Sequence, residues 1–365
     1  MDFPINIAET VWILLAFLFG TAWGSFINVV AGRLPLEKSV LWPNSHCLTC
    51  LRPLNFADNL PVIGWLRRRG RCRFCGTAFS SRYMWVELLS GVIFAVLFYL
   101  EVMRNWQQVP FFADAQHRFF VAEMPWQAVI FFLHHAILAS FLLAASLCDF
   151  DHRSIPLSLT TLGTVIGLVS SVFLPWPWPS VAGAVRSLSA DLSWSFNVRP
   201  GEVPAGLYVW PVWGPLPAWL PAGSPQLGLV TGLTGAFAGM FMVRAVKFLF
   251  EKGLRKEALG LGDADLMMMA GAFVGWQVVV VGFFVGSILS LPLGILIALR
   301  KGERTLPFGP GLALGVMVTL LGWPWLRLVL QPILFDELLV LFMAVFMGGG
   351  LFLASMVLRL LGRGN

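Results

Sequence analysis

Long apolar stretches recur along nearly the whole chain, and they restrict the kinds of fold that it can adopt. The 365 residues are 58% hydrophobic and only 12% charged, whereas soluble domains have about 45–50% apolar and about 25% charged residues. A membrane-crossing helix needs about 20 apolar residues. The sequence therefore predicts an all-α polytopic membrane protein with about nine transmembrane helices. These are expected at about Ile7–Val30, Tyr83–Val102, Trp126–Leu147, Leu157–Leu174, Pro225–Leu249, Asp263–Trp276 and Val278–Leu299, with one more opening near Pro310 and a last one ending near Arg359.

The distribution of charge predicts the orientation of these helices. Residues 32–82 form a polar loop with nine Lys and Arg residues against two acids, Glu37 and Asp58. Basic loops stay on the cytoplasmic side of a membrane, and residues 251–257 and 300–304 are basic as well. We expect the N-terminus outside, the C-terminus inside and a retained first helix. Because topology explains the positive charge, no nucleic-acid partner is expected.

Four of the five cysteines form two Cys-x2-Cys pairs in the first basic loop, Cys47 with Cys50 and Cys72 with Cys75. Each pair directs two sulfurs toward one point, and two pairs complete a tetrahedral shell that favours zinc. A structural metal would stabilise a loop that has little core of its own. An iron–sulfur cluster and a redox dithiol are the alternatives. His46 is expected to be a solvated neighbour rather than a substitute ligand.

Two acidic residues are notable because each lies at the expected cytoplasmic end of an apolar helix. Asp263 follows Gly260-Leu261-Gly262 at the head of one helix, and Asp149 continues the helix that precedes Ile155-Pro156. Ionisable residues in membrane segments are costly and usually functional. The helix that Asp263 opens is only ~20 Å long at 1.5 Å per residue. We therefore expect Asp263 below the membrane surface, in a cavity lined by protein.

Asp149 and Asp263 are the candidate catalytic residues. Two neighbouring carboxylates share one proton, so that one member can take a proton from water while the other polarises a scissile carbonyl. The sequence holds no GxSxG, HExxH, Ser/Lys or Cys/His arrangement that would compete. The alternative interpretation is that both acids only cap helices or form ion pairs. The residues that follow, from Asp151 to Arg153, are expected to form an ordinary solvated turn.

These features divide the chain into five expected regions. They are a first transmembrane helix at 1–31, a cytoplasmic four-cysteine zinc-binding domain at 32–82, helices 2–4 with Asp149 at 83–174, an extracytoplasmic loop at 175–224, and helices 5–9 with Asp263 at 225–365. The loop at 175–224 is rich in Trp and Pro and nearly neutral. This composition favours an ordered loop at the outer membrane interface.

A series of motifs in a fixed order covers the chain from Gly24 to Gly315. The series comprises Gly24-Ser25-Phe26-Ile27-Asn28-Val29-Val30 with Arg33-Leu34-Pro35, the four cysteines with Gly70-Arg71-Cys72-Arg73, Ser81-Arg82-Tyr83 with Glu87, Asp149 with Ile155-Pro156, Gly260-Leu261-Gly262-Asp263, and Pro307-Phe308-Gly309-Pro310. Together these motifs resemble the type IV prepilin leader peptidases, which are membrane aspartic proteases of the GxGD kind.

The resemblance implies a reaction, a partner and a location. Asp149 and Asp263 would be the catalytic pair, and the enzyme would remove the short basic leader of prepilins or pseudopilins in the bacterial inner membrane, at its cytoplasmic face. Many members with the four-cysteine domain also methylate the new N-terminus, which implies S-adenosylmethionine as a second cofactor beside zinc. Glu87 and Gly91 lie at the edge of the domain where that activity is expected.

Departures from the family pattern leave two other functions to consider. Asp265 stands where the family commonly has Lys, Leu157 follows Ile155-Pro156 where an acid or amide is frequent, and the outer loop and last helix exceed the usual pattern. One alternative is a non-catalytic zinc-ribbon membrane component of a pilus or secretion assembly machine. Another is a presenilin-like protease, which shares Gly-Leu-Gly-Asp but not the cysteine domain.

Overall fold

The computed structural model describes residues 7–107, 117–118, 123–174, 219–221, 224–254, 260–301, 307–334 and 337–361. Within these ranges the chain is helical, with two isolated β-bridges and no strand. Seven described helices are long and apolar enough to cross a membrane, and Leu157–Phe173 is a shorter apolar helix. The prediction of an all-α polytopic membrane protein is therefore confirmed.

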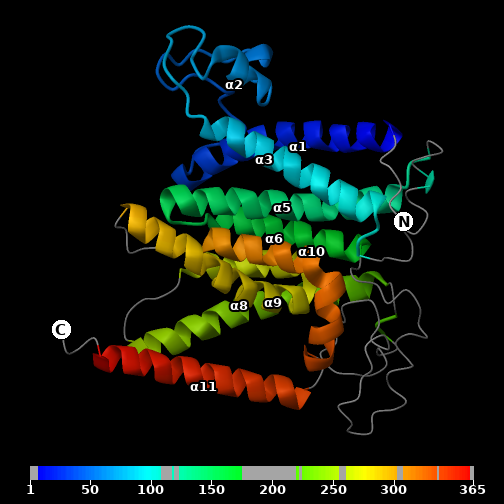
Figure 1. Cartoon of the computed structure of the whole chain (residues 1–365), viewed down its shortest axis with the longest axis vertical. Coiled ribbons are helices and arrows are strands. Elements are labelled where there is room, and N and C mark those ends of the chain that lie inside the picture. Colours follow the sequence, from blue (N-terminus) through cyan, green and yellow to red (C-terminus); the bar gives the residue numbers. More distant parts are fainter. Residues whose placement is uncertain are drawn as a thin grey trace. The chain divides into compact units, whose positions relative to one another are not determined.

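The chain folds into two compact units, and the first contains residues 1–106 and 111–156. Its long helices pack side by side in alternating directions (Figure 1). Its elements are α1 (Ile7–Arg33), the short 3-10 helices Leu34–Leu36 and Phe56–Asp58, α2 (Ile63–Arg68), α3 (Arg82–Leu97), which continues as a π-helix over Phe98–Met103, and α5 (Trp126–His152).

Small residues and one buried polar pair hold this first unit together. A methyl group on Gly24 of α1 would lie 2.8 Å from the Cα atom of Glu87 on α3, so the two helices approach as closely as small residues allow. Between the π-helix that follows α3 and helix α5, His135 Nδ1 and Glu101 Oε1 share a hydrogen bond of 2.6 Å, and both side chains are fully buried. This bond joins the π-helix to α5.

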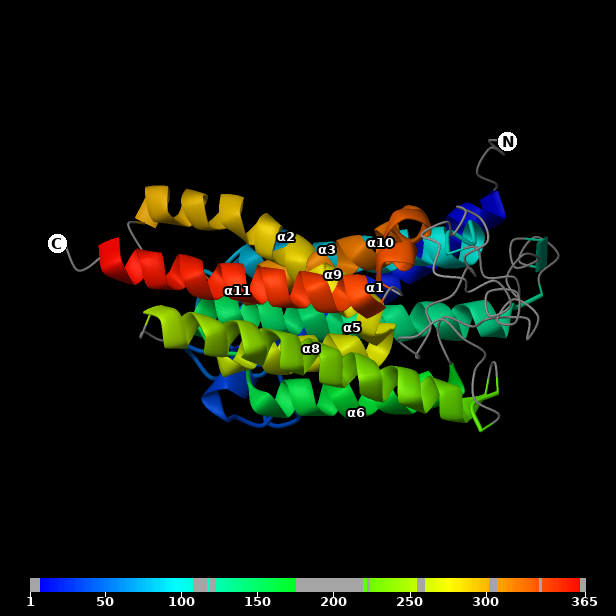
Figure 2. The ribbon, with the colours of Figure 1, turned by 90° about the horizontal axis from the view of Figure 1, so that it is seen from below.

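The second unit contains residues 107–110 and 157–365. Its core is formed by α8 and α10 on either side of the long α9 (Figure 2). Its elements are α6 (Leu157–Phe173), α8 (Pro225–Leu254), α9 (Leu261–Lys301), α10 (Gly309–Leu334) and α11 (Glu337–Leu361).

Gly275 divides α9 into two helical segments. Its φ of 76° and ψ of 176° are not helical, and a positive φ with an extended ψ is tolerated by glycine alone. Both ends of α9 lie on the same side of the unit (Figure 1), so the helix turns back on itself. The sequence predicted two helices, Asp263–Trp276 and Val278–Leu299, and this division is confirmed.

Other boundaries differ from the expectation. Helix α5 extends through His152, so Asp151 and His152, although exposed as expected, belong to the last helical turn and not to a loop. The polar loop between α5 and α6 is correspondingly short, from Arg153 to Pro156. The predicted outer loop at 175–224 lies outside the described residues, except for 219–221 and 224.

Candidate active site and metal centre

The four predicted metal-binding cysteines come together in the segment between α1 and α3. We call residues 34–81 the cysteine module. The Sγ atoms of Cys47, Cys50, Cys72 and Cys75 all lie within 4.8 Å of one another, with 3.7 Å between Cys47 and Cys75 and 3.9 Å between Cys50 and Cys72. Four thiolates around zinc at about 2.3 Å are separated by about 3.8 Å in a tetrahedron. The sulfur positions therefore fit a tetrahedral metal ion.

The two cysteine pairs are held by equivalent backbone turns. The Cys47 N–H donates to the Arg52 carbonyl at 3.0 Å, and the Leu51 N–H donates to the Cys47 carbonyl at 2.9 Å. The second turn repeats both bonds at the same spacing, from Cys72 to Thr77 at 2.8 Å and from Gly76 to Cys72 at 3.0 Å. The fourth residue after the first cysteine has a positive φ in both turns, 58° at Leu51 and 71° at Gly76. Only the second turn has the residue that this backbone favours.

The thiols of the module differ in how readily they ionise. Hydrogen bonds from the Thr77 hydroxyl and backbone lower the pKa of Cys75 to about 6. The backbone N–H of Arg52 lowers the pKa of Cys50, but burial and the neighbouring sulfurs outweigh it and raise that pKa to about 11. Backbone hydrogen bonds from Cys50 and Thr49 lower the pKa of Cys47. A thiolate is the form that binds metal and reacts with electrophiles, so Cys75 is the most reactive of these three thiols.

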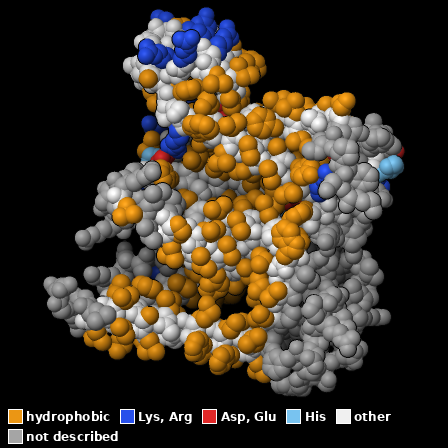
Figure 3. All heavy atoms as spheres, viewed as in Figure 1, with side chains coloured by type: hydrophobic (Ala, Val, Ile, Leu, Met, Phe, Trp, Pro, Cys, Tyr) orange, Lys and Arg blue, Asp and Glu red, His pale blue; other side chains and the backbone are white. Residues whose placement is uncertain are grey.

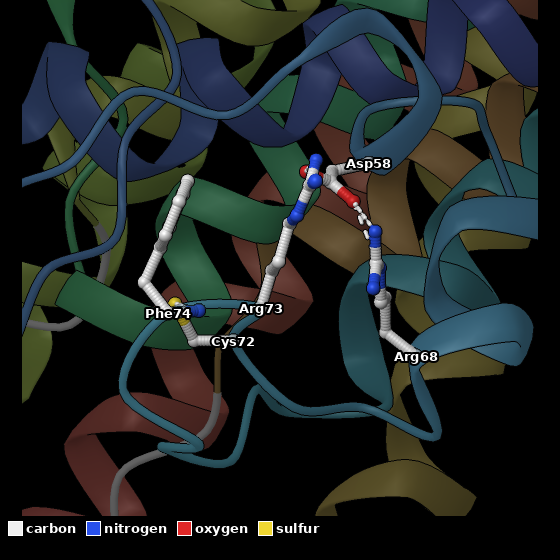
Figure 4. Close-up of polar contacts among 5 residues, drawn as sticks. All are labelled: Asp58, Arg68, Cys72, Arg73 and Phe74. Atoms are coloured by element: carbon white, nitrogen blue, oxygen red, sulfur yellow. Dashed lines mark hydrogen bonds and ion pairs between the residues drawn. The ribbon is translucent and has the colours of Figure 1, made fainter.

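A buried carboxylate, Asp58, connects α2 to the second cysteine turn (Figure 4). Arg68 donates to Asp58 Oδ1 from Nε at 2.8 Å and from Nη2 at 2.7 Å, and Arg73 Nη1 lies 4.0 Å from Oδ2. The Asp58 side chain is only 5% exposed. Arg73 also lies over the ring of Phe74, whose backbone N–H donates to Cys72 Sγ at 3.5 Å. The ion pair thus supports the backbone that presents the second pair of thiols.

The module is joined to the membrane helices through Glu87 of α3. This carboxylate is buried and accepts a hydrogen bond from the Val62 N–H at 2.7 Å. A second hydrogen bond comes from Ser25 of α1. Val62 has a φ of 59°, which is rare for a β-branched residue. The surrounding contacts must therefore hold this backbone in place.

Asp149 lies in the last turn of α5, in the first unit, and its side chain is buried. The helix ends at Arg153, which has a φ of 55° and donates its N–H to the Asp149 carbonyl at 2.9 Å. Asp151, two residues after Asp149, forms an ion pair with Arg82 Nη2 at 2.5 Å. Asp151 is exposed, as expected, but it lies in the last helical turn and has an ion-pair partner.

Asp263 lies in the first turn of α9, in the second unit, and it is buried as well. Gly260 lies close to it, because a methyl group on that glycine would be 3.5 Å from Asp263 Oδ2. Asp265 has a partner of its own, Arg244 of α8, at 3.8 Å. A negative charge in the first turn of a helix is favoured by the helix dipole.

The sequence interpretation missed three contacts around these residues. They are the Arg82–Asp151 ion pair, the Glu87–Val62 hydrogen bond and the Asp58–Arg68 ion pair. Only the last had a signal in the sequence, because Asp58 is one of two acids in a strongly basic loop. The others join residues whose proximity depends on how the helices pack.

Two family profiles match the chain. The bacterial Peptidase A24 N-terminal domain matches residues 18–100, and the type IV leader peptidase family matches residues 198–295. The first range contains the four cysteines and Glu87, and the second contains Asp263. Asp149 lies between the two ranges.

Similar proteins carry related names. The chain is 28% identical over 328 residues to the "Prepilin leader peptidase/N-methyltransferase" of Myxococcus xanthus (strain DK1622). The aligned region covers 87% of this chain and 76% of the relative. It is 29% identical over 336 residues to a protein of the same name from Stutzerimonas stutzeri, covering 85% and 90%. It is 26% identical over 325 residues to the "Type 4 prepilin-like proteins leader peptide-processing enzyme" of Escherichia coli O78:H11, covering 84% and 93%. No solved structure matches the chain.

Apolar helices in both units and a four-thiol module after the first helix define a polytopic α-helical membrane protein with a site for a structural metal. The two profile matches and the relatives make the assignment more specific. The chain belongs to the type IV leader peptidase family.

Proposed function

We propose that this protein is a membrane-embedded aspartic endopeptidase that removes the basic leader from type IV prepilins or pseudopilins and then methylates the new N-terminus. Two similar proteins that match most of the chain are named for both activities, and a third is named for leader-peptide processing; these relatives carry the proposal. The fold supports it, because apolar helices place the protein in the bilayer where the apolar segment of a prepilin would lie.

Asp149 and Asp263 are the proposed catalytic pair. Both are buried carboxylates in terminal helical turns of apolar helices. In the proposed mechanism the two share one proton. The ionised member removes a proton from the attacking water, and the protonated member donates a hydrogen bond to the scissile carbonyl. The same pair then returns a proton to the amine that leaves.

Zinc is the proposed structural ion of Cys47, Cys50, Cys72 and Cys75. The sulfur separations suit it, and a segment with few buried apolar side chains would gain stability from a metal. S-adenosylmethionine is the proposed methyl donor, and it would supply an electrophilic methyl group. The buried carboxylate of Glu87, where the module meets α1 and α3, has the charge that suits a cationic sulfonium.

The proposed location is the bacterial inner membrane, with the cysteine module and both aspartates at the cytoplasmic face. The basic side chains of the module support this orientation. On the face shown in Figure 3, Lys and Arg side chains gather on the module, whereas the helices expose mainly hydrophobic side chains. The same proposal includes the division of the chain into regions. These are a first helix at 1–31, a zinc-binding domain at 32–82, two catalytic helical regions and an outer loop at 175–224.

Co-expression with a candidate prepilin tests the reaction. We expect the wild-type protein to yield a shortened product with a methylated N-terminus, measured by intact mass. Asp149→Asn and Asp263→Asn should each reduce cleavage by about 10²–10⁴-fold, the contribution typical of a general acid or base. Asp265→Asn is the matched control, because that carboxylate lies two residues farther along the helix and has its own partner. Persistent cleavage by both Asn variants would instead favour a non-catalytic role in an assembly machine.

A further inference from the structure

The start of α3 is a junction where several parts of the first unit meet. Asn28 of α1 donates its side-chain N–H to the Tyr83 carbonyl at 3.1 Å. Glu87, one turn farther along, accepts from Val62 of the cysteine module at 2.7 Å. Arg82, the first residue of α3, follows the module directly in the chain. The backbone that carries Arg82 is therefore held by α1 and by the module at the same time.

From this junction Arg82 reaches the last turn of α5. Its Nη2 lies 2.5 Å from Asp151 Oδ2, with 43% of the Arg82 side chain and 22% of the Asp151 side chain exposed. An exposed ion pair of this kind contributes only about 0–1 kcal/mol to stability. Global stability is therefore a weak reason for placing the pair here, and its position relative to Asp149 is the more informative feature.

The last turn of α5 is unfavourable for the residues that it carries. Asp149 and Asp151 both lie at the C-terminal end of a helix, where the dipole places a partial negative charge and where cations are preferred. Terminal turns also lack part of their backbone hydrogen bonds and fray easily. A guanidinium at this end offsets both the dipole and the two acids, and it restrains the turn from outside the helix.

We propose that Arg82 and Asp151 form a positioning pair for Asp149, which fixes the last turn of α5 against the α3 end of the cysteine module. This inference rests on the proposed role of Asp149 as a catalytic residue. Arg82 is paired with Asp151, and we assign its effect to the placement of Asp149. The pair also gives the module a direct route to the active site, because the second cysteine turn ends only a few residues before Arg82.

Charge exchange across the pair tests the inference. We expect Arg82→Ala and Asp151→Asn to lower kcat for prepilin cleavage by roughly 10- to 100-fold, the range that a misplacement of about 1 Å can cause. KM should stay unchanged, since neither residue binds substrate. The double variant that combines Arg82→Asp with Asp151→Arg should recover most of the lost kcat, because an acid at the start of α3 and a base at the end of α5 suit both helix dipoles.

Arg104→Ala is the matched control, as this arginine follows the opposite end of the same membrane segment and donates to the Tyr99 hydroxyl at 2.9 Å. It should leave kcat unchanged. Single variants that retain wild-type kcat would overturn the inference, and so would an exchanged pair that inserts normally but recovers no activity. If the wild-type protein fails to cleave any prepilin, or if Asp149→Asn stays active, the proposed function fails instead.

Discussion

Gly235 lies where α8 and the first segment of α9 are closest, and its replacement by alanine gives a quantitative test of the second unit. A methyl group on Gly235 would lie 2.8 Å from the carbonyl carbons of both Gly271 and Gly275, and closer still to the Gly271 carbonyl oxygen. Ordinary van der Waals contact for such a group begins at 3.4 Å. The carbonyl carbons alone require the two helices to separate by 0.6 Å, the difference between these two distances, and the closer oxygen requires a larger shift.

This separation displaces the segment that begins with Asp263. Overpacking of a tight contact costs about 1–3 kcal/mol, so Gly235→Ala should lower the thermal stability measurably. A displacement of about 1 Å can cost 10²-fold in rate, so a shift of this order should lower kcat for prepilin cleavage by about 10- to 100-fold. A larger residue at the same position, such as Leu, should abolish activity.

The assay is cleavage of a candidate prepilin in proteoliposomes, with thermal unfolding of the detergent-solubilised protein measured in parallel. Gly349→Ala is the control, because a methyl group on that α11 glycine meets nothing within 4 Å. The reasoning would be refuted if Gly235→Ala cleaved prepilin and unfolded like the wild-type protein. It would also be refuted if Gly349→Ala caused an equal loss.

Three further predictions concern the cysteine module. Asp58→Asn should weaken zinc binding about fivefold, because the partly exposed Arg68 loses a charge-assisted partner worth about 1 kcal/mol. Competition with a chromophoric chelator measures this change, and an unchanged zinc affinity would contradict the prediction. Leu51→Gly should stabilise the zinc-bound module by about 1 kcal/mol, because a left-handed backbone costs a side chain about 1–2 kcal/mol, and a lower midpoint of thermal unfolding would contradict this. After chelation, iodoacetamide should label Cys75 first at pH 7.5 and Cys50 last, as followed by mass spectrometry. A pKa of about 6 leaves Cys75 ionised above pH 6, so its labelling should slow below that pH, whereas a pKa of about 11 keeps Cys50 protonated. Equal labelling rates would contradict the assignment.

The helices could be predicted from the sequence because hydropathy alone separates apolar spans from polar loops. The division of α9 at Gly275 was anticipated within two residues, since the apolar run from Asp263 to Leu299 is too long for one span. Helix ends were less accurate. The expected solvated turn at Asp151 is helical, because Arg82 compensates for the acidic C-terminus, and that partner is distant in the sequence.

The four-cysteine cluster was predictable for a different reason. Two Cys-x2-Cys pairs encode their own geometry, because each turn brings its sulfurs together locally and only the two turns need to meet. Asp149 and Asp263 could be selected as acids at the ends of apolar helices, and both are buried. The contacts that hold Asp149 in place involve helices α1, α3 and α5 packed side by side, and such contacts leave no pattern in the sequence.

The turn at Gly275 also affects how the protein enters the bilayer. The first segment of α9 is too short to cross about 30 Å of hydrocarbon alone, and the backbone at the turn would expose unpaired peptide groups to lipid if it entered by itself. The two segments must therefore be inserted together as a helical hairpin, with α8 already available to cover the bend through Gly235. On this reasoning Asp263 is buried only after both segments of α9 have been synthesised, whereas the cysteine module precedes them in the chain and can fold earlier.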